Sequence, residues 1–255
     1  MLVEPLVLPF AVALGAILGS FLNVLILRLP NEESVVYPGS KCPKCQTPIA
    51  WYDNVPILSW IVLGGRCRSC KAGISVQYPL IELLVAVLWG LAVWQYGVTL
   101  TALTAALFGT ILLGIAVTDA RHYLIPDEYT LGGLVLGLAL SLRGGVDGLI
   151  EAAIGAAVGF GVLYAVAVLG EKVFRKEAMG GGDIKMMAMV GAFVGWQGVL
   201  LTIFLGSLLG TLVFVPLQIK QKRLVPFGIF LAAGAALVFV VGDALIEWYW
   251  GLVVG

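Results

Sequence analysis

The chain has 255 residues, of which 60% are hydrophobic and 12% are charged, and its mean hydropathy is +1.03. Charged residues are too few to cover the surface of a water-soluble domain of this size, so the composition indicates a membrane protein. Fifteen Lys and Arg balance fifteen Asp and Glu, which excludes nucleic acid as a partner held by bulk charge.

Eight apolar stretches approach the length needed to cross a bilayer, which is about 17 to 25 residues. They predict an all-α polytopic membrane protein with about eight transmembrane helices, at approximately 5–28, 79–97, 99–118, 129–142, 148–170, 184–197, 199–218 and 226–248. The fourth and sixth stretches are short and border polar motifs. We expect them to start in the headgroup layer or beside a wet cavity.

The distribution of Lys and Arg predicts the orientation, because short loops rich in these residues stay in the cytoplasm. With the N-terminus outside, every Lys and Arg except Arg143 falls on the cytoplasmic side. This bias predicts a multi-pass protein with both termini outside. Neither a basic residue before the first apolar run nor a small-residue cleavage site after it is found, so we expect 5–28 to be a retained anchor.

Residues 29–78 are the one stretch of soluble character, and they hold all four cysteines. Two CxxC pairs, Cys42 with Cys45 and Cys67 with Cys70, are separated by 21 residues. Two such pairs can complete a tetrahedral four-cysteine zinc site, and a loop of about 50 residues has too little core to fold without such help. A redox-active pair and free thiols are the alternatives, although a cytoplasmic loop disfavours disulfides.

Acidic residues in or beside apolar stretches are costly, so each is a candidate functional residue. The candidates we single out are Glu82, Asp119, Asp127, Glu128, Glu151 and Asp183. We interpret His122 and Lys185, which lie beside two of these acids, as polar residues of the cytoplasmic face.

Asp119 closes the third stretch and Asp183 opens the sixth, so both are predicted to lie at the cytoplasmic edge. Two neighbouring carboxyl groups can share a proton, and one can then activate water while the other donates to a carbonyl oxygen. The glycines before Asp183 permit positive φ and the close approach of another backbone. The alternative is that Asp183 only caps a helix, and for Asp127, after Pro126, a cap is the favoured interpretation.

Gly180-Gly181-Gly182-Asp183 resembles the GxGD signature of membrane aspartyl proteases, and its context is similar to that of the bacterial type IV prepilin peptidases. The similarity extends over nearly the whole chain. Its other motifs are Gly19-Ser20-Phe21-Leu22-Asn23-Val24, Arg28-Leu29-Pro30, the two CxxC pairs, Trp51-Tyr52-Asp53-Asn54-Val55-Pro56, Tyr78-Pro79-Leu80-Ile81-Glu82, Asp119 and Ile125-Pro126-Asp127.

One motif departs from the family pattern. Pro226-Phe227-Gly228 is followed by Ile229, where the pattern has a second proline. We expect this difference to alter the start of the last helix without touching the pair of aspartates.

The resemblance implies an aspartic endopeptidase of the bacterial cytoplasmic (inner) membrane, serving type IV pili or type II secretion. Such enzymes remove the leader of prepilins and pseudopilins at the cytoplasmic face, and many then N-methylate the new terminus with S-adenosylmethionine. The expected partners are these substrates and membrane lipid. The resemblance makes Asp119 and Asp183 the catalytic pair and makes Cys42, Cys45, Cys67 and Cys70 a structural zinc site.

Gly180, Gly181 and Gly182 are expected to bind substrate, because a glycine run lets a substrate backbone lie close to the neighbouring aspartate. The expected domains are a first transmembrane anchor (1–28), a cytoplasmic four-cysteine loop associated with methylation (29–78) and a transmembrane peptidase domain (79–255).

The site for S-adenosylmethionine has no sequence signature, because the chain lacks a glycine-rich Rossmann turn. Asn23 and Glu82 are candidates, but structural roles are favoured: a hydrogen bond between helices for Asn23, and a cap or an ion pair at the start of the second apolar stretch for Glu82. Two other functions stay open. One is a peptidase without methylation, in which the zinc loop is only structural. The other is a membrane thiol oxidoreductase or metal transporter, which would leave Asp119 and Asp183 unexplained.

Overall fold

The computed structural model describes residues 5–176, 179–221 and 226–254, without the side chains of 214–221 and 254. Two basic residues of a predicted cytoplasmic loop, Lys222 and Arg223, lie outside this description. Within it the chain is helical, without a named strand. The long helices are α1 (Val7–Arg28), α3 (Gln77–Tyr96), α4 (Leu100–His122), α5 (Asp127–Ser141), α6 (Gly145–Phe174), α7 (Gly181–Gln221) and α8 (Gly228–Val254).

Six stretches of the described residues are long and apolar enough to cross a membrane. They are Val7–Asn31, Gln77–Tyr96, Leu100–His122, Asp127–Phe174, Gly181–Val213 and Gly228–Val253. The predicted all-α membrane class is therefore confirmed, whereas the predicted count of eight spans is not.

The difference in span count has a simple origin. The fourth and fifth predicted stretches form two separate helices, α5 and α6, which are joined by the single turn Leu142–Gly144 and together make up the one apolar range Asp127–Phe174. The sixth and seventh both lie in α7, which is interrupted only at Gly195 (φ 70°, ψ 179°). Glycine adopts this non-helical conformation at little cost, so α7 consists of two helical segments that meet at Gly195.

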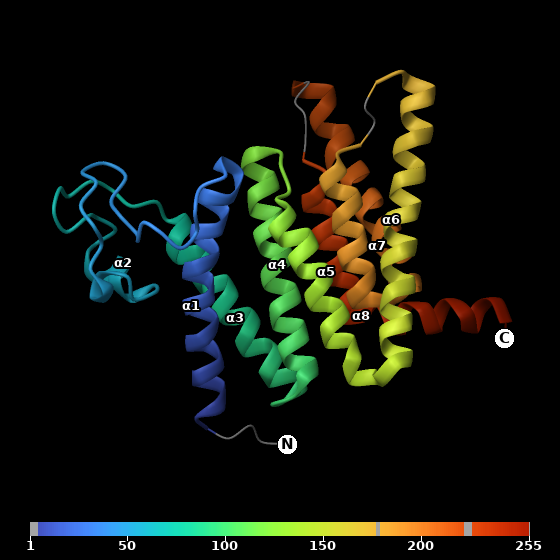
Figure 1. Cartoon of the computed structure of the whole chain (residues 1–255), viewed down its shortest axis with the longest axis horizontal. Helices are drawn as coiled ribbons and strands as arrows, with labels where there is room; N and C mark the ends of the chain where they lie inside the picture. Colours follow the sequence, from blue (N-terminus) through green and yellow to red (C-terminus); the bar gives the residue numbers. More distant parts are fainter. Residues whose placement is uncertain (1–4, 177–178, 222–225, 255) are drawn as a thin grey trace. The chain divides into compact units, whose positions relative to one another are not determined.

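The helices form two compact units, Met1–Thr110 and Ile111–Gly255, and the division falls inside α4. In the first unit α1 packs along α3, and the loop between them carries the cysteines and the short α2 (Leu58–Val62) (Figure 1). In the second unit α7 packs against α5, α6 and α8 (Figure 1). The domain boundaries expected at residues 28 and 78 stay predictions.

Glycines hold helix backbones close together in both units. A Cβ added to Gly19 would lie 2.7 Å from the Cα of Glu82, so α1 and α3 touch there. In the second unit Gly155 of α6 and Gly191 of α7 face each other, and a Cβ on either would clash with the other's carbonyl oxygen. This contact explains why small residues recur at four-residue spacing, as expected for helices that pack in lipid.

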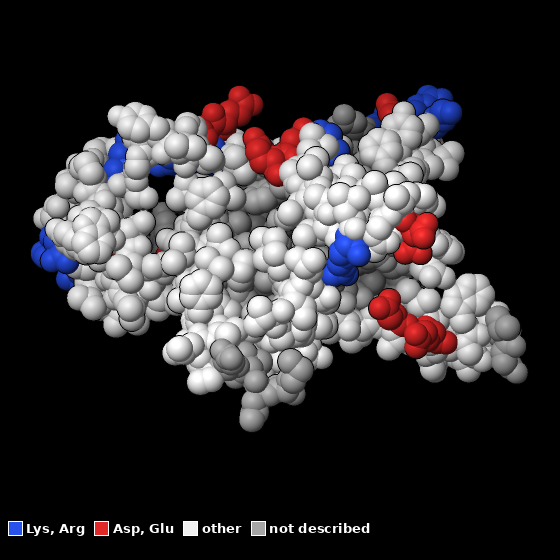
Figure 2. Space-filling model, turned by 60° about the horizontal axis from the view of Figure 1, so that its bottom comes forward, with Lys and Arg blue, Asp and Glu red and all other residues white. Residues whose placement is uncertain are grey.

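The surface agrees with a membrane environment. Large apolar side chains stay exposed along the helices, for example Phe10 at 69%, Trp94 at 67% and Phe204 at 62%. Figure 2 shows charged side chains in a few patches separated by wide uncharged areas. Soluble monomers rarely expose so much contiguous apolar surface, so the uncharged areas fit contact with lipid.

We expect Gly191→Ala to lower the free energy of unfolding by about 1–3 kcal/mol, because the new methyl group meets the backbone of Gly155. The control is Gly161→Ala in α6, where a Cβ would meet no atom within 4 Å. Because alanine is the better helix former, this control should be neutral or slightly stabilising. Thermal unfolding in detergent, followed by circular dichroism, measures both. Equal stability of the two variants would contradict the packing.

Candidate active site and metal centre

Asp119 lies in the last turn of α4 and is 5% exposed. The helix ends at His122, because Tyr123 takes a left-handed conformation (φ 55°) while its N–H still donates to the carbonyl of Asp119. The chain then passes through the buried Ile125 and Pro126 into α5. This turn leaves the Asp119 carboxyl group buried at a helix end.

Asp183 is the third residue of α7, and its N–H donates to the carbonyl of Gly180 (3.2 Å). Because α7 begins at Gly181, the alternative that Asp183 is the helix N-cap is wrong. Its Oδ1 is buried without a hydrogen-bond partner in the part of the chain that the structure describes. The charge of Asp119 acts on Asp183, so the two carboxyl groups share one electrostatic environment.

The three glycines before Asp183 do not have the predicted conformation. None of Gly180, Gly181 and Gly182 has a positive φ. Gly182 is needed for close packing, since a Cβ there would lie 3.0 Å from the Cβ of Ile125. Gly181 is exposed and faces open space. Their assignment to substrate binding stays a prediction.

The start of α8 completes this region, and sequence reasoning missed it. A Cβ on Gly228 would lie 2.8 Å from both Asp119 Oδ2 and Ile125 Cδ1. The backbone N–H groups of Gly228 and Ile229 lie where they can donate to the Asp119 carboxyl group. The expectation that the departure at Ile229 leaves the aspartates untouched is therefore wrong. The Pro226-Phe227-Gly228 motif could have indicated a functional role for this segment. It lies more than 100 residues after Asp119, so the sequence alone did not predict their contact.

Asp127 has a different role from the predicted one. It is the first residue of α5, whose N-cap is Pro126, so the cap interpretation is wrong. Both of its carboxylate oxygens accept from Lys185 Nζ at 2.7 Å. This ion pair joins the N-terminal parts of α5 and α7. Glu128 and Glu151, the other acidic candidates of this unit, are exposed.

The two CxxC turns of the first unit have the same backbone conformation. The N–H of Gln46 donates to the carbonyl of Cys42 at 2.9 Å, and that of Lys71 donates to Cys67 at 3.0 Å. Gln46 and Lys71 both take positive φ, 58° and 59°. Each turn thus presents its two thiols from a tight knuckle, as the sequence spacing predicted.

The four sulfur atoms form one cluster that can hold a metal ion. All lie within 4.8 Å of one another, with Cys42 and Cys70 Sγ at 3.8 Å and Cys45 and Cys67 Sγ at 3.9 Å. A tetrahedral ion with bonds of about 2.3 Å to sulfur requires a separation of about 3.8 Å, so the donor set fits zinc. Hydrogen bonds with Thr47 lower the pKa of Cys45 to about 6, which favours the thiolate that a metal binds.

A second contact holds the loop around this cluster. Arg68, inside the second CxxC turn, donates to Asp53 through Nε (2.7 Å) and Nη2 (2.6 Å) and lies over the ring of Tyr52. The Arg68 guanidinium holds the pKa of Asp53 below its usual range. The 51–56 segment is therefore fastened to the metal-binding turn.

The two candidates for the S-adenosylmethionine site make structural hydrogen bonds. Asn23 Nδ2 donates to the carbonyl of Tyr78 (3.1 Å) and so ties α1 to the start of α3. Glu82 on α3 is 7% exposed and accepts the N–H of Ile57 at 2.6 Å, which ties the loop to the helix. Ile57 takes a positive φ of 63°, a conformation that a branched residue rarely adopts. Both contacts favour the packing interpretation.

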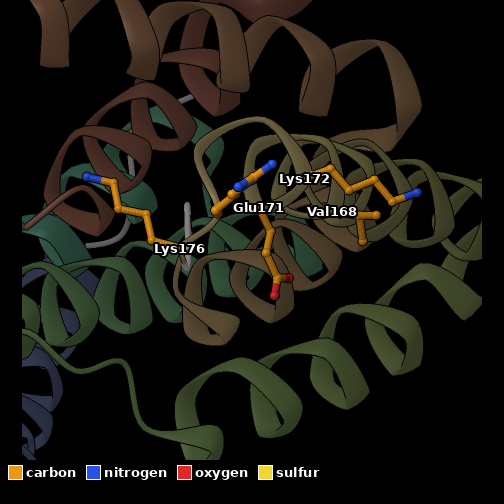
Figure 3. Close-up of a pocket in the computed structure, with 5 residues that line it drawn as sticks. Val168, Glu171, Lys172 and Lys176 are labelled. Atoms are coloured by element: carbon orange, nitrogen blue, oxygen red, sulfur yellow. The ribbon is translucent and has the colours of Figure 1, made fainter.

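A surface hollow near the end of α6 has no predicted site residue. Its lining is Val168, Glu171, Lys172, Arg175 and Lys176. The labelled side chains in Figure 3 spread apart instead of converging on one point. We therefore do not assign it to the active site.

The fold defines a helical membrane protein with buried carboxyl groups at helix ends and a four-cysteine cluster. Two family models match: the Bacterial Peptidase A24 N-terminal domain over residues 13–96, and the Type IV leader peptidase family over residues 106–215. The chain belongs to the type IV leader peptidase family.

The chain is also similar to proteins that are named prepilin leader peptidase/N-methyltransferase, which supports its membership of this family. The protein from Neisseria gonorrhoeae is 34% identical over 96% of this chain and 96% of its own length. That from Pseudomonas aeruginosa is 36% identical over 93% of this chain and 91% of its own length. The protein from Myxococcus xanthus is 39% identical, and the match covers 87% of this chain and 66% of that protein's own length. No solved structure matches the chain.

We expect Glu82→Ala to release the cysteine loop from α3, because the N–H of Ile57 loses its acceptor. Limited proteolysis should then cut within 29–76 several times faster than in the wild type. Glu82→Gln keeps an acceptor oxygen and should restore most of the protection. The control Leu83→Ala changes a 48% exposed neighbour on the same helix. Equal cleavage rates in the alanine variants would contradict a tethering role for Glu82.

Proposed function

We propose that this protein is a prepilin leader peptidase and N-methyltransferase of the bacterial inner membrane, with its active sites facing the cytoplasm. The peptidase half is supported by the burial of Asp119 at the end of α4 and by the effect of its charge on Asp183 at the start of α7. Family membership and the names of the relatives support both halves. The substrates are type IV prepilins and related pseudopilins.

Peptide hydrolysis needs one carboxylate and one carboxylic acid. The apolar helix of the substrate lies against the membrane helices, and its leader stays in the cytoplasm. One aspartate takes a proton from water as the water oxygen attacks the scissile carbonyl, while the protonated partner donates to the carbonyl oxygen. The amine then takes the proton held by the first aspartate as the C–N bond breaks, and the second aspartate recovers a proton from a hydroxyl of the tetrahedral intermediate. The exposed Gly181 leaves room for the substrate backbone beside the pair.

Methyl transfer acts on the amine that cleavage creates. When bound, S-adenosylmethionine would supply the methyl group and leave as S-adenosylhomocysteine, while the amine loses a proton. Cys42, Cys45, Cys67 and Cys70 hold a zinc ion that folds the loop, since such a loop lacks a core of its own. Glu82 and the Asp53–Arg68 ion pair hold this loop in one conformation. These contacts support a folded loop that takes part in methylation, and they argue against a flexible linker.

We expect Asp119→Asn and Asp183→Asn each to slow prepilin cleavage by at least about 100-fold, because neither the base nor the acid has a substitute. The control is Asp147→Asn, which makes the same change at an exposed position in the first turn of α6. Purified protein in detergent is mixed with a prepilin, and the products are weighed by mass spectrometry. Normal cleavage by both folded variants would show that the mechanism is wrong.

We expect the purified protein to contain about one zinc ion per chain, measured by elemental mass spectrometry. Cys42→Ser combined with Cys70→Ser should lose the zinc and the methylation of the product while cleavage continues. Ser69→Ala, inside the second CxxC turn, is the matched control. If the wild type cleaves prepilin but adds no methyl group in the presence of S-adenosylmethionine, the protein is a peptidase alone and the cysteine loop is structural.

A further inference from the structure

The first turn of α8 has two backbone donors that its own helix does not use. The N–H groups of Phe230 and Leu231 donate to the carbonyl of Phe227, at 3.0 and 3.2 Å. These are the first bonds of the helix, so Gly228 and Ile229 keep N–H groups without an acceptor in the helix. In an apolar environment such groups need a partner elsewhere.

The partner is Asp119. Both N–H groups lie where they can donate to its carboxyl group, and Gly228 is itself buried. Asp119 is 5% exposed, and its buried Oδ2 has no hydrogen-bond partner among the described residues. A buried carboxyl group thus faces the free end of a helix of 27 residues.

The approach is so close that it requires glycine. A Cβ on Gly228 would lie 2.8 Å from Asp119 Oδ2 and 3.2 Å from its Cγ. A side chain at this position would displace the carboxyl group or the helix. Gly228 has no positive φ, so the reason for glycine here is space and not backbone conformation.

We propose that Gly228 and Ile229 are positioning residues of the peptidase: Gly228 leaves room for the Asp119 carboxyl group, and the two N–H groups fix its orientation. The proposal rests on the catalytic role of Asp119 proposed above. It accounts for the departure from the family pattern at position 229, because isoleucine supplies an N–H group that proline would lack. In this chain the departure adds a donor at the catalytic pair.

The arrangement also assigns the two roles in hydrolysis. Backbone N–H groups and the positive end of a helix dipole stabilise a negative oxygen. Asp119 is therefore the carboxylate that receives the proton of water. Asp183, for which no such backbone donor is found among the described residues, holds the proton that is donated to the scissile carbonyl oxygen. Asp119 then returns its proton to the leaving amine as the C–N bond breaks.

The first test is Gly228→Ala in the full-length protein. We expect kcat for prepilin cleavage to fall at least about tenfold, because a shift of about 1 Å in a catalytic group can cost up to 100-fold. KM should stay within about twofold, since the change does not touch substrate binding. The matched control is Gly132→Ala in α5, where a Cβ would meet no atom within 4 Å. A wild-type kcat in Gly228→Ala overturns the proposal.

The second test removes one donor without adding bulk near Asp119. Ile229→Pro deletes an N–H group in the first turn of a helix, where proline is well accommodated. Its pH profile of kcat should be displaced from that of the wild type, while Ile229→Val should retain the wild-type profile. Asp183 interacts electrostatically with Asp119, so the pH profile reports on both carboxyl groups together. Gly228→Ala could fail to fold. In that case Ile229→Pro, which is expected to fold, still tests whether α8 positions Asp119. An unchanged profile overturns the proposal.

The two proposals fail in different ways. If Asp119→Asn cuts prepilin normally, Asp119 is not catalytic and the proposed function is wrong. If Asp119→Asn is inactive while Gly228→Ala and Ile229→Pro behave as the wild type, the peptidase mechanism stands and only the role of α8 is wrong.

Discussion

Helix ends determine where this chain can carry out polar chemistry. In an apolar environment each backbone N–H and carbonyl group must find a partner, and only the first and last turns of a helix leave such groups free. Asp119 lies in the last turn of α4 and Asp183 in the first turn of α7. The donors directed at Asp119 come from the first turn of α8. Without these ends, the carboxyl groups would be buried among apolar side chains at high cost.

Close packing is what allows the helix ends to meet. Gly182 and Gly228 belong to different helices, and both lack the side chain that would push Ile125 away. Ile125, buried between them, sets the spacing of the ends of α4, α7 and α8. Deeper in the same unit, Gly155 and Gly191 bring α6 and α7 into backbone contact. The acidic site thus depends on glycines that never take part in a chemical step.

Local patterns in the sequence were sufficient for features that depend on near neighbours. Hydrophobic runs predicted the helices, and the CxxC spacing predicted two matching turns whose sulfur atoms converge. The span count was less predictable. Whether Gly195 separates two helices or kinks one depends on the packing around it. Asp127 looks like a cap beside Pro126, and only the folded chain brings Lys185, 58 residues away, to its carboxylate.

The role of α8 illustrates the limit of sequence reasoning most clearly. Gly228 lies 109 positions after Asp119, and the intervening helices have to pack before the two can touch. A substitution at 229 looks like a change in helix propensity when only the sequence is considered. In the structure its proposed consequence is electrostatic, because the N–H group at this position acts on the Asp119 carboxyl group.

The two proposed chemistries place different demands on the protein. Hydrolysis needs two carboxyl groups held in different protonation states, and the chain provides this with helix ends and burial. Methyl transfer needs a free amine, which does not exist until the leader has been removed. Cleavage must therefore come first. The peptidase site can work without the metal cluster, whereas the methylation step has no acceptor without the peptidase site. Loss of the cysteines should consequently leave a cleaved, unmethylated product, while loss of the aspartates should leave the substrate intact.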